Sequence, residues 1–282
     1  MIKVINLLFF FKKLKLILNY FIDQNFSSIF TSYKITRNLT NLRSSSLTSL
    51  KIQCDSEAYY IIIDSSKDIA YSYSKSLNLI STFTNLHNPF RVVFFYEKNI
   101  KQYIVSAWDG MWKFGNNQNQ YIIDNQFIYT GHSFRGMYYN SSTNYIFVCS
   151  YWINGLFVFD TDLTLIRSIY FGNTVMHDID EYNGCLYVSS FTGAVWVLKD
   201  EKVSQSFQTN CSSITALKID RNGFIAVLCQ NPSSMIYVYN SNGVYADLSF
   251  NGTILNDNVT FMDFDGNQTF VIVTTKTLYF LN

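Results

Sequence analysis

Several residues suited to anion binding recur at one place in a repeated sequence pattern. Arg91 lies in FRVVFF, Arg135 in FRGMYY, and His177 with Asp178 in MHDIDE. The corresponding positions in the other copies of the pattern are threonines: Thr48, Thr215 and Thr260. Guanidinium groups, with hydroxyl groups beside them, bind a carboxylate or phosphate through charge-assisted hydrogen bonds. The pattern therefore predicts an anion-binding ring, unless the arginines cap strand ends or pair with Asp178 and nearby carbonyl groups.

The three histidines, His87, His132 and His177, are further candidates for chemistry, because converging imidazoles can hold a metal ion. His87 and His132 precede their copies of the pattern by similar distances, which would bring all three to one place. Turn residues that hydrogen-bond to the backbone are the alternative, and we favour it. The sequence has no GxSxG, Walker or HExxH motif and no carboxylate pair at a defensible spacing. We expect no metal, no cofactor and no catalytic residue.

Two tryptophans, Trp108 in SAWDG and Trp152 in SYWING, occupy equivalent turns of successive copies. We expect them to pack against the adjacent copy, because indole rings bury a large apolar area. The alternative is an exposed aromatic platform.

An internal repeat of about 42 residues defines the elements that must position these residues. One column of the repeat is an aromatic or apolar pair that begins, at steps of 41, 45, 39, 41 and 42 residues, at Tyr71, Trp112, Phe157, Trp196, Tyr237 and Tyr279. A second column consists of the apolar anchors Leu50, Val93, Met137, Ile179, Leu217 and Met262. The interval is typical of four-stranded blades, and no long stretch past residue 45 has helical periodicity. The sequence predicts an all-β, six-bladed β-propeller with four-stranded blades, whose first strands line a central channel.

The copy FRGMYYNSSTNYIFVCSYWINGLFVFDTDLTLIRSI resembles an NHL-type or YVTN-type propeller repeat. In those repeats a glycine-led strand is followed by a turn, a strand similar to IYVAD and a strand ending in VFD. The resemblance covers about residues 45–282. It implies a toroid that binds partners on its faces, and some relatives in these families have lactonase or lyase activity.

The sixth copy ends after TLYFLN, one strand short of four. An incomplete blade leaves a strand edge unpaired, and an N-terminal segment commonly supplies the missing strand. Residues 29–39, IFTSYKITRNL, alternate in polarity and favour β-structure, so we expect them to form the outer strand of blade six and close the ring. We predict a single propeller domain over residues 25–282.

Residues 1–24 are apolar and basic, and their lysines interrupt the apolar run that a spanning helix needs. They are an atypical signal, an interfacial anchor or a start upstream of the true protein, and these alternatives stay open. Membrane contact is expected only through this segment. Seven Asn-x-Ser/Thr sequons, against about five expected by chance, lean toward an extracellular or membrane-associated protein.

Composition restricts the partners of the chain. Its 282 residues are 48% hydrophobic, with a net charge of +1 and no lysine or arginine run after residue 15, which argues against nucleic acid. The five cysteines lack metal-ligand spacing. Those in apolar runs, Cys149, Cys185 and Cys229, are expected to be buried thiols, and a disulfide framework is not expected.

These features favour a monomeric, non-catalytic scaffold that binds a protein or a small anionic ligand. The ligand would be recognised at the channel mouth by the ring residues and Asp178. The alternative is a lactonase-like hydrolase or lyase that acts on a small anionic substrate in the channel. A deep channel pocket with converging histidine and carboxylate groups would favour the enzyme, and a shallow ring of arginine and threonine would favour the scaffold.

Overall fold

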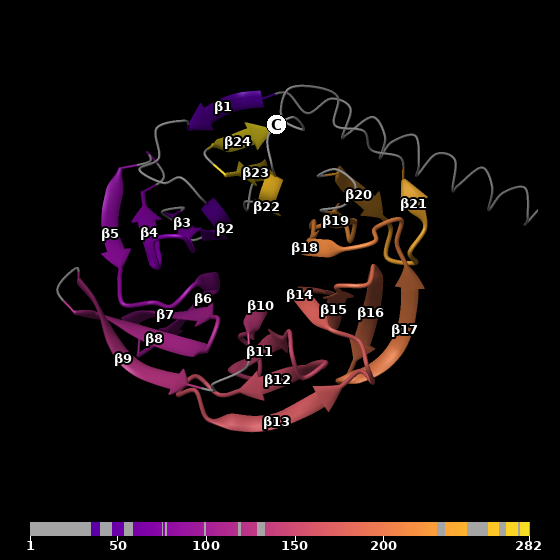
Figure 1. The fold of residues 1–282 in the computed structure, drawn as a ribbon, viewed down its shortest axis with the longest axis horizontal. Helices are drawn as coiled ribbons and strands as arrows, with labels where there is room; N and C mark the ends of the chain where they lie inside the picture. Colours follow the sequence, from indigo (N-terminus) through magenta and orange to yellow (C-terminus); the bar gives the residue numbers. More distant parts are fainter. Residues whose placement is uncertain are drawn as a thin grey trace, which may run out of the picture.

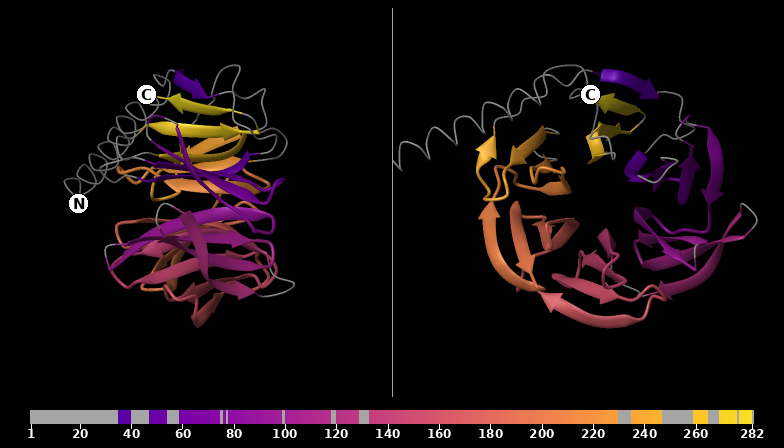
Figure 2. Two further views of the ribbon diagram at one scale, coloured as in Figure 1. Left: turned by 90° about the vertical axis from the view of Figure 1, so that its left-hand side faces the viewer. Right: turned by 180° about the vertical axis from the view of Figure 1, so that it is seen from behind.

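The computed structural model is a ring of six antiparallel sheets with four strands each, which confirms the predicted six-bladed propeller (Figure 1). The structure describes residues 35–39, 47–53, 59–74, 76, 78–98, 100–117, 120–128, 133–229, 235–246, 259–264, 269–275 and 277–281. Seen from behind, the six sheets surround one central axis (Figure 2, right). Within the described residues, no helix has the length and apolar character needed to cross a bilayer.

The strands of blades one to five follow one another outward from the channel in chain order. Blades one to three consist of β2 (Leu47–Gln53), β3 (Tyr59–Asp64), β4 (Ile69–Tyr73) and β5 (Leu79–Phe83); β6 (Pro89–Glu97), β7 (Ile100–Ala107), β8 (Gly110–Asn117) and β9 (Gln120–Ile128); and β10 (Phe134–Asn140), β11 (Tyr145–Ser150), β12 (Gly155–Phe159) and β13 (Leu165–Tyr170). Blades four and five consist of β14 (Met176–Tyr182), β15 (Cys185–Ser190), β16 (Ala194–Lys199) and β17 (Lys202–Gln208); and β18 (Ile214–Ile219), β19 (Ile225–Cys229), β20 (Met235–Tyr239) and β21 (Tyr245–Ala246).

Blade six is built from both ends of the described chain. It contains β22 (Val259–Phe264), β23 (Phe270–Thr274) and β24 (Leu278–Leu281), and its outer strand is β1 (Ile35–Leu39), which lies beside β24 in Figure 1. The two strands are antiparallel, with Leu39 opposite Leu278. The predicted closure by an N-terminal strand is therefore confirmed over residues 35–39. The rest of the predicted closing segment, and residues 1–24, lie outside the described residues.

The second strand of each blade is covered on both faces by neighbouring blades, which explains its apolar sequence. Strands β19 (IAVLC) and β23 (FVIVT) are buried at every position. The outermost strands face solvent, and β17 is exposed along most of its length. In the aromatic column the second member of every pair is buried, whereas Trp196 is half-buried and packs against the ring of Phe171 at 5.8 Å.

Several turns between strands are closed by short polar side chains. The Asp160 carboxylate accepts hydrogen bonds from the backbone N–H groups of Asp162 and Thr164. Asp220 and Asn240 close their own turns in the same way. These contacts fix the direction in which the next strand leaves.

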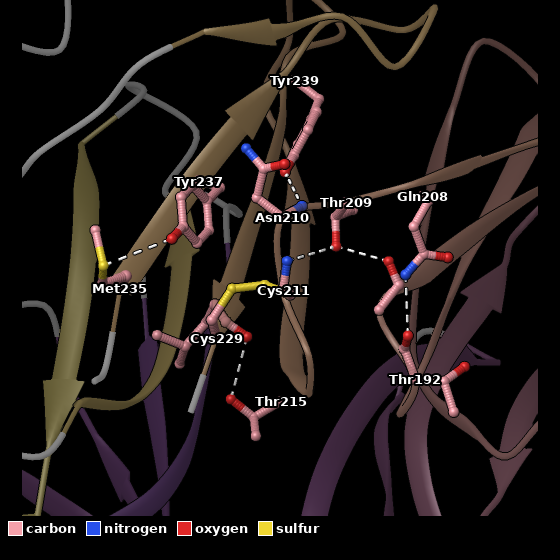
Figure 3. Close-up of a disulfide and its surroundings, with 12 residues drawn as sticks. Thr192, Gln208, Thr209, Asn210, Cys211, Thr215, Cys229, Met235, Tyr237 and Tyr239 are labelled. Atoms are coloured by element: carbon pink, nitrogen blue, oxygen red, sulfur yellow. Dashed lines mark hydrogen bonds between the residues drawn. A yellow bond between two sulfur atoms is a disulfide. The ribbon is translucent and has the colours of Figure 1, made fainter. Parts of the chain in front are cut away.

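One cysteine prediction is wrong. Cys211 and Cys229 form a disulfide with a Cα–Cα distance of 5.5 Å (Figure 3), so Cys229 is not a free thiol. The bond joins the segment before β18 to the end of β19, and Ile214 of β18 is the register partner of Cys229. Cys149 is free and buried, as predicted, and Cys185 is free and half-buried.

Candidate functional site

A β-bulge near the start of each innermost strand determines which side chains face the channel. In β14, Met176 pairs with Ser190 and Asp178 pairs with Ser189, so His177 is the extra residue. The innermost strands of all six blades have a shift at this place. A bulge bends the strand and redirects the side chains around it. The upper mouth of the channel is the end at which these strands begin, and the lower mouth is the end at which they finish.

The register corrects the predicted ring in blade two. Arg91 stands at the position that Asp178 has on β14, one residue after the bulge, and the bulge residue of β6 is Phe90. The apolar anchor of this blade is therefore Val92 and not Val93. Two adjacent valines are equally apolar, so the sequence pattern could not choose between them. A one-residue slip moves side chains to the opposite face of a strand.

Arg91 extends across the middle of the channel, between the upper and lower mouths. Its Nη2 donates to the carbonyl oxygen of Thr215 at 3.1 Å and lies 3.5 Å from the Asp178 carboxylate, and its guanidinium stacks 3.9 Å from the centre of the Phe261 ring. Gly136 leaves room beside Asp178, because a Cβ atom there would collide with the backbone and carboxylate of Asp178. Arg91 thus links blade two to blades four, five and six.

The carboxylate that receives Arg91 is fully buried. Burial opposes the charge of Asp178, but Arg91, Lys218 and the backbone N–H of Leu217 outweigh it, so the pKa of Asp178 is lowered. The Leu217 N–H donates to the carboxylate at 3.0 Å. Asp178 and Arg91 are therefore a charged pair that joins blades two and four across the channel.

Arg135 has a different environment at the upper mouth. Its guanidinium lies 3.7 Å from the centre of the Phe90 ring, 5.1 Å from Tyr151 and 5.9 Å from Trp108. Its side chain has no hydrogen bond or ion pair with any described residue, and its Nε is buried. Burial, followed by repulsion from Arg91, lowers the pKa of Arg135 to about 10, so the group remains cationic at neutral pH. Arg135 is thus a charge held in an aromatic frame without a carboxylate partner in the described structure.

Three rings at the upper mouth, those of Trp108, Tyr151 and Phe191, come from one repeated position, the residue that follows the second strand of blades two, three and four. Backbone N–H groups at this position donate to carbonyl oxygens of the segment before the innermost strand, from Trp108 to His87 at 3.1 Å, from Tyr151 to Ser133 at 2.9 Å and from Phe191 to Val175 at 2.9 Å. These bonds hold the three rings at the upper mouth. The same position in blade one is Ser65 and in blade six Thr275, so the aromatic surface is confined to one side of the ring within the described residues.

The rings form a continuous and exposed series. Trp108 contacts Trp152 edge to face with centroids 6.4 Å apart, Trp152 contacts Tyr151 at 5.2 Å, and Tyr151 contacts Phe191 at 5.9 Å. Trp152 is 54% exposed, and Trp108 and Phe191 are each 37% exposed. The two tryptophans are thus more exposed than we expected from packing against an adjacent blade. Their exposure agrees with the alternative, an aromatic platform. We call Phe90, Trp108, Arg135, Tyr151, Trp152 and Phe191 the upper platform.

His177 lies beneath the upper platform. It is 9% exposed, its ring lies 6.3 Å from that of Phe191, and its Nδ1 has no hydrogen-bond partner in the described structure. Burial, followed by repulsion from Arg135 and Arg91, lowers its pKa to about 3. His177 is therefore neutral at physiological pH.

The remaining predicted site residues do not gather around Arg135 within the described structure. The hydroxyl groups of Thr215 and Thr260 donate to carbonyl oxygens of the adjacent strands at 3.3 Å. Thr48 is the bulge residue of β2. His87 is exposed and lies 3.0 Å from the Asp109 carboxylate, while His132 is outside the described residues.

No metal-binding cluster of three or more His, Cys, Asp or Glu side chains occurs in the part of the chain that the structure describes.

Sequence reasoning missed three residues of the upper platform, Phe90, Tyr151 and Phe191. A signal for two of them was present, because Tyr151 and Phe191 directly follow an apolar second strand, as Trp108 does. Phe90 was missed through the slip in blade two.

Comparison with known proteins identifies the fold and no family. No protein-family model matches the sequence, and no curated protein matches it in a sequence search. In structure, 1261 chains match, so the fold alone does not select a function. Membership of the NHL or YVTN repeat families therefore stays a prediction.

Two solved structures illustrate the likeness. Raptor from Chaetomium thermophilum has a TM-score of 0.63 and 13% identity, and the match covers 86% of this chain and 24% of that chain. BBS1N, solved in complex with ARL6DN and soaked with lead, has a TM-score of 0.62 and 12% identity, and the match covers 89% of this chain and 96% of that chain. This chain thus spans about a quarter of the Raptor chain and nearly all of BBS1N.

Proposed function

We propose that this protein is a non-catalytic binding propeller that docks a protein partner on the upper platform, with an acidic side chain of the partner placed against Arg135. The observation that carries the proposal is the Arg135 guanidinium, which is cationic, largely buried among rings and unpaired within the described residues. A buried charge without a counter-charge is costly, so a carboxylate that reaches it is strongly favoured.

The surroundings of Arg135 suit a protein surface. Tryptophan, tyrosine and arginine are the residues that contribute most to protein–protein binding, especially where they cluster. Trp108, Trp152 and Phe191 present apolar area to solvent around the charge. A partner that places an acidic side chain between apolar ones would bury this area and neutralise Arg135 together. The BBS1N propeller, which resembles this chain in fold, was solved bound to a protein, which is consistent with this class of function.

The predicted site residues have different roles in this proposal. Arg135 contacts the partner, and neutral His177 lies beneath it with one ring nitrogen that can donate and one that can accept a hydrogen bond. Arg91 and Asp178 hold the blades together across the middle of the channel, through their mutual pair and through hydrogen bonds to blade five. Less evidence supports the alternative, a hydrolase or lyase, because Asp178 is the only carboxylate of the predicted ring, and its Oδ2 atom is held by the Leu217 N–H and Arg91.

Titration with two short peptides tests the proposal. One is an acetylated and amidated tripeptide with a central aspartate between two leucines, and the other has asparagine in place of the aspartate. Tryptophan fluorescence reports binding, because Trp108 and Trp152 lie in the upper platform. We expect the aspartate peptide to bind about tenfold more tightly than the asparagine peptide, and binding to weaken as salt rises.

Variants separate the charge of Arg135 from nonspecific effects. Arg135→Ala should abolish the preference for aspartate, and Arg135→Lys should keep part of it, because lysine retains the charge without the planar fork. Lys202→Ala removes an exposed positive charge at the lower face and should bind as the wild type does. Equal binding of the two peptides, or a preference that survives Arg135→Ala, would contradict the proposal. Binding of inorganic phosphate without either peptide would indicate a small-anion site instead.

A further inference from the structure

The lower mouth of the channel contains a cavity of about 570 Å³, which the upper platform does not share. It is formed where the innermost strands of blades one to five end, and it is within the size range of pockets for small molecules. Arg91 crosses the channel between the two mouths, so the cavity and the upper platform are separate places.

One wall of the cavity is aromatic. Phe94 and Tyr96 of β6 contribute rings that meet edge to face at 6.5 Å, and Tyr138 and Tyr139 of β10 face them from blade three. Tyr96 is 53% exposed and forms the outer lip. Such a wall favours a flat, largely apolar molecule, because ring faces pack best against planar groups.

The inner end of the cavity is polar, and it contains an ammonium group without a hydrogen-bond acceptor among the described residues. Lys51, Asp180 and Lys218 line it. The Asp180 carboxylate already accepts from the backbone N–H of Ile219 at 2.9 Å and from that of Glu181 at 3.0 Å. Lys218 is 7% exposed, and its ammonium group has no hydrogen bond or ion pair within 4.0 Å among the described residues. The Lys218 ammonium is therefore a donor that the described residues leave without an acceptor.

Lys218 remains charged in this position. Burial opposes its charge, but the carboxylates of Asp180, Asp178 and Asp263 outweigh burial, so the pKa of Lys218 is raised. Asp263 is also occupied, since it accepts from the backbone N–H groups of Ile52 at 3.2 Å and Phe264 at 3.0 Å. The three carboxylates thus stabilise the charged ammonium group through longer-range electrostatic attraction. Its N–H groups remain available to donate hydrogen bonds to an acceptor in the cavity.

We propose that the lower mouth is a binding site for a small, flat, apolar molecule that ends in a carboxylate or carboxamide. The ring of the molecule lies against Phe94 and Tyr138, and its carbonyl-type oxygen accepts hydrogen bonds from Lys218 and Lys51. A ligand with an ammonium group in place of the acceptor is rejected, because it would bring a third cation to the two lysines. The site is independent of protein docking on the upper platform.

Calorimetric titration with three matched probes tests the site: 3-(indol-3-yl)propionate, its primary amide and tryptamine. We expect the acid and the amide to bind with similar affinity and tryptamine to bind at least about tenfold more weakly. Failure of all three probes to bind, or binding of tryptamine as tightly as the acid, would overturn the proposal.

Two variants locate the binding. Lys218→Met removes the donor and should abolish binding of the acid and the amide. Because this change leaves three carboxylates near each other and could prevent folding, Ser141→Trp is the second variant; it places a bulky ring at the rim from an exposed turn residue and should block all binding without altering the core. Binding that persists in Ser141→Trp would refute the location. Arg135→Ala should leave all three affinities unchanged, which distinguishes failure of this site from failure of the upper platform.

Discussion

Acidification should destabilise this protein through His177. The imidazole is buried, and burial followed by repulsion from Arg135 and Arg91 lowers its pKa from 6.5 to about 3, while Asp178 acts weakly in the opposite direction. Unfolding exposes the ring and restores an ordinary pKa. The unfolded chain therefore binds more protons than the folded chain between these two pKa values, and the free energy of unfolding falls as pH decreases through that window.

The size of the effect follows from the pKa difference. Each pH unit below the unfolded pKa costs about 1.4 kcal/mol, so between pH 7 and pH 5 His177 contributes a loss of about 2 kcal/mol. Burial raises the pKa of Asp180 and of Asp220, and these carboxyl groups act with the opposite sign, because the folded state then binds more protons. A comparison of the wild type with His177→Gln cancels their contribution, since both proteins contain them.

Urea unfolding of the wild type and His177→Gln at pH 7, 6 and 5 measures this difference. The wild type should lose about 2 kcal/mol more than the variant between pH 7 and pH 5. His87→Gln is the matched control, because His87 is exposed, and it should follow the wild type. Equal pH slopes for the wild type and His177→Gln would refute the reasoning, and so would an NMR titration that gives His177 a pKa near 6.5.

Three further predictions concern stability. Deletion of residues 1–24 should leave the melting temperature nearly unchanged, whereas deletion of residues 1–40 removes β1 and should cause aggregation or a large drop in melting temperature; equal melting temperatures would contradict closure by β1. Replacing Cys211 and Cys229 together by serine should lower the free energy of unfolding by about 3 kcal/mol, because the bond closes a loop of 18 residues, and an unchanged urea midpoint would speak against the disulfide. Trp196→Ala should cost about 3 kcal/mol in the same assay, the lower end for a packed aromatic residue because Trp196 is half-buried, and a cost near zero would indicate that the ring does not pack between blades.

The architecture was predictable because each copy of the repeat must place apolar residues at the same positions of its strands. Two columns recur at nearly the same interval, and a missing strand in copy six pointed to a segment elsewhere in the chain that could supply it. The register within a copy was less certain. In FRVVFF both valines suit the anchor, so the position of Arg91 depended on a choice that apolar character could not make.

The candidate site was only partly predictable, because its chemistry depends on which side chains meet across blades. Arg91 and Arg135 look alike in sequence, yet one pairs with Asp178 and the other is surrounded by rings. The disulfide was hidden for the same reason: neither the spacing nor the surroundings of Cys211 and Cys229 indicated that β18 and β19 would bring them together. Such contacts require the three-dimensional structure.

The pairing of β1 with β24 has a consequence for how the protein is made. Ile35 and its register partner Leu281 are 246 residues apart in the chain. During synthesis, blades one to five can each form from neighbouring hairpins as the nascent chain leaves the ribosome, but β1 must wait for β24. Throughout that interval an unpaired strand is free to add to the wrong sheet edge, in the same chain or in another. The pairing that makes the ring continuous therefore follows synthesis of all the other blades, and until it forms β1 is a strand edge that a chaperone could protect.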